Sequence, residues 1–119
     1  MARYLLFAFS DCKDPAREVE YNDWYDNVHI PDMLEVPGMI SATRWESAHS
    51  REGMRRKYLA LYELETDNLA EFDAGVRERG MWTMREGRFS DLPEFDPPNI
   101  PRVYKQIMAE KKPQKARGQ

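Results

Sequence analysis

The chain has 119 residues and a mass of 14.1 kDa, which is the size of one domain, since domains commonly hold roughly 100–150 residues. Hydrophobic residues make up 41% and charged residues 33%, a balance that favours a soluble globular domain and excludes extended disorder. The formal net charge of −3 lacks the basic character of nucleic-acid-binding proteins. No apolar run approaches the about 20 residues that span a bilayer, so neither nucleic acid nor membrane is an expected partner.

Cysteine content and the two ends of the chain indicate compartment and domain organisation. Cys12 is the only cysteine, which excludes an intrachain disulfide and a cysteine-built zinc site. A lone thiol fits a reducing compartment, so we expect a cytoplasmic protein with Cys12 as a passive thiol. We predict one ferredoxin-fold domain over residues 1–110. Residues 111–119 are rich in lysine and lack apolar periodicity, which predicts a basic, disordered C-terminal tail.

The chain begins with a predicted strand and helix. Residues 3–9 alternate along two faces that are both largely apolar, which predicts a strand covered on both sides. Asp14 and Pro15 mark a helix start, because aspartate caps free backbone N–H groups and proline fits the first helical position. The helix should run to about His29, Pro31 should end its regular part, and residues 32–34 can form one further turn.

Two further strands are predicted at residues 39–45 and 58–64, on either side of a polar segment that is typical of an exposed loop. Asn68 followed by Glu71 forms a capping box, which predicts the start of a second helix. Gly80 is placed to end that helix.

The last part of the chain is less regular. Residues 81–89 fit a short helix or an irregular lid, the proline-rich residues 92–99 should lack regular structure, and residues 102–108 form a last strand. The order βαββαβ predicts an α+β, ferredoxin-like protomer, a four-stranded antiparallel sheet with two helices on one face. Because strand 3–9 is apolar on both faces, the uncovered face needs a partner. A second copy packed sheet to sheet is the simplest one.

A cluster of side chains suited to acid–base chemistry falls in the first helix. On an α-helix Asn22, Tyr25, Asp26 and His29 share one side of the rod. Histidine suits proton transfer because its ordinary pKa is about 6.5, and Asp26 or Asp32 would orient the imidazole. We therefore predict His29, Tyr25 and Asp26 as catalytic residues.

Simpler interpretations of the same residues stay open. A histidine at a helix end can satisfy the last carbonyl groups, and Tyr25 can be an ordinary core aromatic. Asp26, His29 and Asp32 could also ligate a metal. With one histidine and no second strong ligand motif, we expect no metal.

Other residues are candidates for holding a substrate. Arg44 could clamp an anionic group or be a strand-end charge. Tyr62 could line a cavity or a dimer interface, and Trp82, beside two methionines, could roof an aromatic ligand or plug the core. The predicted substrate-binding residues are Arg44, Tyr62, Trp82, Asp32 and Trp24.

The segment around these residues resembles a known signature. The run Trp-Tyr-Asp-x-x-His-x-Pro at residues 24–31, within residues 21–34 and followed by residues 36–38 and 42–45, is similar to that of EthD-like proteins in the dimeric α+β barrel superfamily. The resemblance implies ferredoxin-like protomers that pair sheet to sheet and enclose a cavity. In several polyketide cyclases of the superfamily a histidine and a tyrosine act as acid and base. His29 matches the family histidine, whereas residues 81–99 match no pattern of the family.

Three functions follow from the residues and the resemblance. The first is a cofactor-independent lyase, cyclase or isomerase that uses His29 and Tyr25 on an aromatic or polyketide-like molecule in a cavity. The second is a non-catalytic ligand-binding or structural dimer. The third is a haem-degrading or quinol-type monooxygenase, in which His29 would bind the haem iron. We expect the first, as a homodimer without a cofactor.

Overall fold

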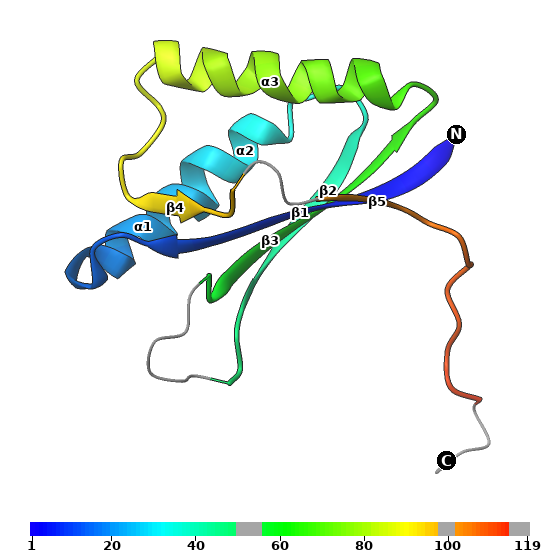
Figure 1. The fold of residues 1–119 in the computed structure, drawn as a ribbon, viewed down its shortest axis with the longest axis horizontal. Helices are drawn as coiled ribbons and strands as arrows, with labels where there is room; N and C mark the ends of the chain where they lie inside the picture. The colour runs from blue at the N-terminus through cyan, green and yellow to red at the C-terminus, as the bar shows by residue number, and fades with distance from the viewer. Residues whose placement is uncertain (50–55, 98–101, 115–119) are drawn as a thin grey trace.

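A computed structural model, which describes residues 1–49, 56–97 and 102–114, has the predicted α+β, ferredoxin-like architecture. The elements are β1 (Ala2–Cys12), the 3-10 helix η1 (Pro15–Arg17), α1 (Glu18–Trp24), the π-helix η2 (Tyr25–His29), α2 (Ile30–Met33), β2 (Met39–Glu46), β3 (Tyr58–Thr66), α3 (Leu69–Arg85), β4 (Pro93–Phe95) and β5 (Val103–Lys105). The antiparallel sheet has the order β2-β3-β1-β4, and β5 also pairs with β1. The helices lie on one face of it (Figure 1).

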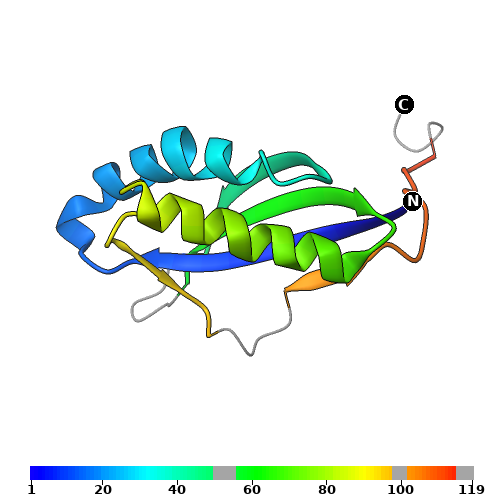
Figure 2. The same ribbon diagram turned by 90° about the horizontal axis from the view of Figure 1, so that it is seen from above.

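The first three predicted strands are confirmed. Strand β1 pairs with β3 from Ala2↔Thr66 to Ser10↔Tyr58, and β2 occupies the other edge of β3. Along β3 every second residue from Tyr58 to Leu64 is buried, because alternate side chains of a strand point to the same face. These buried residues face the helices, where Figure 2 shows α3 running along the sheet beside the shorter helical segments.

The fourth strand position differs from the prediction. The prediction of irregular structure over residues 92–99 is wrong, because Pro93–Phe95 forms β4 against the end of β1. The predicted strand 102–108 is reduced to β5. Four positions of β1 separate Leu6 from Ser10, whereas eight positions separate their partners Val103 and Phe95. The two short strands β4 and β5 therefore pair with different parts of β1 and do not form one continuous ladder with it.

Helix α3 starts as predicted but ends later. The Asn68 side chain accepts a hydrogen bond from the Glu71 N–H, which confirms the predicted cap. The prediction that Gly80 ends the helix is wrong, since the helix continues to Arg85. The helix instead stops before Gly87, which has a φ of +67°. There Gly87 bonds back to Met84 and Arg88 to Thr83, the double hydrogen bond of a Schellman motif.

The first helical segment includes the predicted further turn after Pro31, but without the predicted break. Asp14 caps the Ala16 N–H as expected, but Pro31 does not end the regular helix, which extends to Met33. The preceding turns widen into the π-helix, where the Ile30 N–H bonds to the Tyr25 carbonyl five residues back. Proline lacks an N–H and clashes with the preceding turn of an α-helix. A local π-helix relieves this conflict, and such segments occur frequently at functional sites.

The two faces of the sheet differ in composition and cover. The covered face contributes tyrosines and small residues to the core. The other face carries the apolar residues Phe7, Phe9 and Leu59, with Trp45 57% exposed. Within the described residues no helix is both long and apolar enough to cross a membrane.

Candidate functional site

His29, at the end of the π-helix, is enclosed by aromatic rings. Its imidazole stacks on Trp24 with 4.8 Å between ring centroids, and it meets Tyr25 edge-on at 5.1 Å. Phe89 and Phe95 lie at 5.8 and 6.4 Å. The residue is 9% exposed. The structure therefore brings the predicted histidine and tyrosine into contact.

The enclosure sets the charge of the imidazole. Burial lowers the pKa of His29 to about 4, and the positive charge of Arg44 adds to this effect, whereas the negative charge of Asp32 opposes it. The low-dielectric surroundings disfavour the charged form. His29 is therefore neutral at pH 7 and can accept a proton.

Tyr25 presents a buried phenol that has no hydrogen-bond partner among the described residues. Its side chain is fully buried. Burial raises the pKa of Tyr25 far above its ordinary value and Tyr21 raises it further, whereas Arg44 and the nearby Ser10 hydroxyl lower it. Tyr25 therefore remains protonated at pH 7, and its hydroxyl can donate a hydrogen bond.

Arg44 projects from β2 into a group of tyrosine rings. Its guanidinium carbon lies 4.2 Å from the Tyr25 ring centroid, and 5.5 and 5.3 Å from those of Tyr21 and Tyr58. The side chain is 13% exposed. Nη1 donates to Asp26 Oδ1 at 2.9 Å, but Nε and Nη2 are buried without a partner among the described residues. Tyr25 thus touches an imidazole and a guanidinium.

The two predicted carboxylates have different surroundings. Asp26, whose side chain is 55% exposed, pairs with Arg44. The Asp32 side chain is 8% exposed and accepts from Arg88 Nε at 2.7 Å. Asp32, and not Asp26, is the carboxylate whose charge acts on the pKa of His29.

The bonds of Asp32 also hold the segment that covers His29. Arg88 directly precedes Phe89, one of the enclosing rings, and the Arg88 carbonyl accepts from Trp24 Nε1 at 2.8 Å. Arg79 of α3 donates to the Asp32 carbonyl at 2.8 Å. These bonds tie the segment after α3 to the first helical segment.

The remaining predicted substrate-binding residues lie in two places. Tyr62 is buried on β3, and its pKa is raised mainly by burial and also by Tyr25, so it belongs to the same interior. Trp82 instead lines an open groove of about 810 Å³ beside α3, together with Phe72. Arg79 covers the Trp82 ring at 3.9 Å. His29, Tyr25 and Arg44 do not line this groove.

Several residues of the site were absent from the sequence prediction. Phe89 and Phe95 complete the enclosure of His29, but they lie in a proline-containing segment without a helix or strand period. Tyr21 packs against Tyr25, and its spacing of four residues from Tyr25 on one helical segment is the signal by which it could be found.

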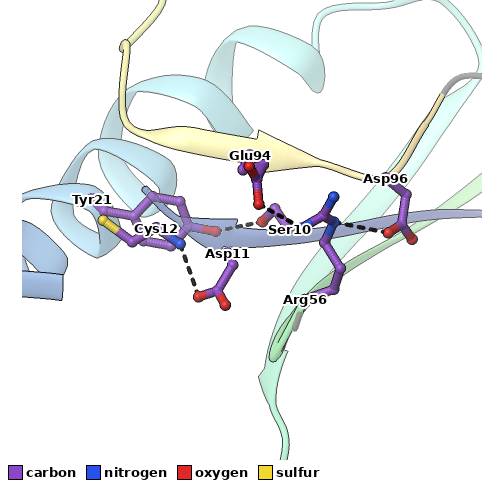
Figure 3. A network of polar contacts seen from close by, with 7 residues as sticks. All are labelled: Ser10, Asp11, Cys12, Tyr21, Arg56, Glu94 and Asp96. Atoms are coloured by element: carbon purple, nitrogen blue, oxygen red, sulfur yellow. Dashed lines mark hydrogen bonds and ion pairs between the residues drawn. The ribbon is translucent and has the colours of Figure 1, made fainter. Parts of the chain in front are cut away.

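A polar network closes the end of β1 next to the site (Figure 3). Ser10 and the Tyr21 hydroxyl are hydrogen-bonded to each other. Arg56 donates to Glu94 at 2.7 Å and to Asp96 at 3.0 Å, which attaches the start of β3 to β4. This network fixes the strand that carries Phe95.

The other candidate side chains show no such grouping. Cys12 is buried, and burial raises its pKa, consistent with the predicted passive thiol. His49 is exposed. Within residues 1–49, 56–97 and 102–114, no three or more histidine, cysteine, aspartate or glutamate side chains are grouped to hold a metal ion.

Comparison with known proteins identifies the fold. The sequence matches no family profile and no curated protein. Among solved structures, it is similar to a Shewanella loihica PV-4 protein provisionally named a monooxygenase, with 20% identity, a TM-score of 0.55, and coverage of 92% of this chain and 99% of the other. HapK from Hahella chejuensis has 13% identity, a TM-score of 0.57, and coverage of 96% and 100%.

A third solved structure bears on the resemblance seen in the sequence. It is an ethyl tert-butyl ether D (EthD) family protein from Bacillus halodurans C-125, with 16% identity, a TM-score of 0.51, and coverage of 90% and 100%. At these identities the likeness concerns the fold. The chain has the ferredoxin-like fold of an EthD family protein, as its sequence motif indicates.

Proposed function

We propose that the protein is a cofactor-independent enzyme of the lyase, cyclase or isomerase type, acting on an aromatic or polyketide-like carbonyl compound. One observation carries this proposal: a neutral imidazole, His29, is in contact with a buried phenol, Tyr25, whose hydroxyl has no partner among the described residues. A base and a hydrogen-bond donor side by side are the parts that proton transfer next to a carbonyl needs.

In the proposed reaction His29 takes a proton from a carbon or hydroxyl of the substrate. The electron pair left behind moves to the carbonyl oxygen, which accepts a hydrogen bond from Tyr25. The negative charge of Asp32 favours the imidazolium that forms. Return of the proton to a different atom completes an isomerisation. Alternatively, attack of the enolate carbon on a second carbonyl closes a ring, and the alkoxide that forms takes the proton back from His29.

Substrate entry requires a change in the packing around His29. Phe89 is 39% exposed and is the enclosing ring most open to solvent. We propose that it moves aside when a substrate ring enters, leaving Trp24 and Phe95 as apolar walls. Sites for small molecules are typically apolar with a few placed polar groups.

The test is turnover of a panel of aromatic and polyketide-like ketones, followed by mass spectrometry and chromatography of the products. His29→Asn and Tyr25→Phe should each lower the rate by about 10²- to 10⁴-fold. Matched controls are His49→Asn and Tyr104→Phe, at exposed positions, which should keep the wild-type rate. Unchanged turnover in both site variants would remove the assignment.

Two other functions remain as alternatives. A ligand carrier would bind compounds of the same panel and release them unchanged. Two similar structures carry provisional monooxygenase names, which favours testing haem uptake as well. A Soret shift that is lost in His29→Ala would support a haem-binding function.

We also propose a homodimer formed by the uncovered face of the sheet, with residues 1–110 as the domain and 111–119 as its tail, in the cytoplasm. Trp45 and Phe9 leave an apolar surface on that face. Residues 111–114 are exposed, and residues 115–119 lie outside the described residues. Sedimentation velocity should give a dimer that Trp45→Glu dissociates, and a wild-type monomer would refute this arrangement.

A further inference from the structure

The uncommitted hydrogen-bond donors in the core point to the chemical class of the substrate. We propose that Arg44 and Tyr25 form a receptor for a carboxylate on an aromatic ring, with Arg44 Nε and Nη2 binding its two oxygens and the Tyr25 hydroxyl donating a third hydrogen bond. This inference rests on the proposed function, because it names the substrate that the same site would take.

The free edge of Arg44 has the geometry of a carboxylate receptor. Nε and Nη2 form the side-on edge of the guanidinium, whose two N–H groups point in the same direction and match the two oxygens of a carboxylate. Both are buried without a partner among the described residues. Asp26 occupies only Nη1, so the edge suited to bidentate binding is left over.

The surrounding protein groups do not supply the missing acceptors. The rings of Tyr21, Tyr25 and Tyr58 face the guanidinium carbon at 4.2–5.5 Å. Burial raises the pKa of Tyr21, whereas Ser10 and the nearby Arg44 lower it. The Tyr21 hydroxyl is hydrogen-bonded to Ser10, and a single neutral hydroxyl does not match the two N–H groups of the Arg44 edge. Arginine keeps its charge in proteins, so an acceptor that also carries negative charge would suit this edge best.

Tyr25 adds the third donor and links the receptor to His29. All three described side-chain atoms that are buried without a partner belong to Arg44 and Tyr25. Three donors without a matching acceptor favour a ligand that brings acceptor oxygens and negative charge. Since the Tyr25 ring also touches His29, an aromatic acid held here would present its ring to the imidazole.

The experiment uses benzoate and 2-naphthoate as probes, with benzamide and 2-naphthamide as uncharged matches, in calorimetric titrations of the full chain. The carboxylates should bind the wild type about 10- to 100-fold more tightly than the amides. Arg44→Lys keeps the charge but loses the paired N–H edge, and should weaken carboxylate binding by about tenfold or more. Arg44→Met should abolish the preference for carboxylate.

Controls separate this inference from the proposed function. Arg17→Met changes an exposed arginine paired with Glu20 and should leave binding unchanged. His29→Asn should lose turnover but keep the carboxylate preference.

Carboxylate binding that depends on Arg44, without any turnover that depends on His29, supports the carboxylate receptor and refutes the proposed enzymatic function. Failure of both acids to bind, or equal binding by Arg44→Met and the wild type, overturns the receptor even if turnover depends on His29. Circular dichroism confirms that each variant is folded.

Discussion

The two sides of Tyr25 show how differently a histidine and an arginine respond to burial. His29 is enclosed by four rings and stays neutral, since burial lowers its pKa to about 4. Arg44 is nearly as buried and lies over the same tyrosine ring, yet a guanidinium cannot give up its proton in a protein. Among the described residues it has one exposed counter-ion, and two of its nitrogens have no partner.

This difference indicates what each residue can contribute. Burial favours the uncharged form of the imidazole, so His29 is present at pH 7 as a neutral base. The guanidinium keeps its charge, and its unpaired N–H groups carry a desolvation cost until an acceptor arrives. A ligand oxyanion would remove that cost, which is why we assign recognition to Arg44 and proton transfer to His29.

The largest expected effect is on the pH dependence of stability. The pKa of His29 falls from about 6.5 in the unfolded chain to about 4 in the folded protein, so the unfolded state binds the proton first. The stabilisation from neutral His29 is complete above pH 6.5, is lost as the pH falls toward 4, and changes little below 4. Between pH 6.5 and pH 4, neutral His29 contributes about 3 kcal/mol to the free energy of unfolding.

Urea unfolding at pH 7 and pH 4 measures this contribution. Between pH 7 and pH 4, the free energy of unfolding of His29→Asn should fall by about 3 kcal/mol less than that of the wild type. His49→Asn, at an exposed position, should keep the wild-type difference. An identical pH dependence in wild type and His29→Asn would mean that the imidazole is not enclosed as described.

A smaller effect of opposite sign is expected at Arg44. Arg44→Met replaces a buried charge and its unpartnered nitrogens by an apolar chain of similar length, and leaves Asp26 free in solvent. Replacing buried charges with apolar groups is often neutral or stabilising, so the free energy of unfolding should rise by about 1 kcal/mol. A decrease of about 2 kcal/mol or more in the free energy of unfolding would show that the contacts with the tyrosine rings stabilise the buried guanidinium.

The smallest effect concerns the counter-ion. Asp26→Asn should lower the free energy of unfolding by about 0.5–1 kcal/mol, because the partner charge on Arg44 is buried although Asp26 is exposed. In the Arg44→Met background the same substitution should leave the free energy of unfolding unchanged. The four proteins together form a double-mutant cycle. Glu20→Gln, in the exposed pair with Arg17, is the matched control and should have little effect.

Regular alternation and capping residues made most of the fold predictable. The first three strands and the start of α3 at Asn68 depend on local patterns, which the structure confirms. The π-helix before Pro31 and the strand at Pro93 could not be predicted in this way. A π-helix and an interrupted ladder tolerate these prolines, and both depend on tertiary packing.

The site was predictable only in part. The contact between Tyr25 and His29 follows from their spacing on one helical segment. The burial of Arg44 depends on how β2 packs against that segment, and no local pattern reports it. The role of Phe89 depends on the ion pair between Asp32 and Arg88, in the segment after α3, which joins residues far apart in the chain.

The most direct test of the central claim is a crystal structure of the protein with bound 2-naphthoate. The account predicts the carboxylate within hydrogen-bond distance of Arg44 Nε and Nη2 and of the Tyr25 hydroxyl, with the Phe89 ring displaced and the naphthalene ring against His29. A naphthoate bound instead in the groove beside Trp82, with Arg44 unchanged and His29 still enclosed, would contradict it.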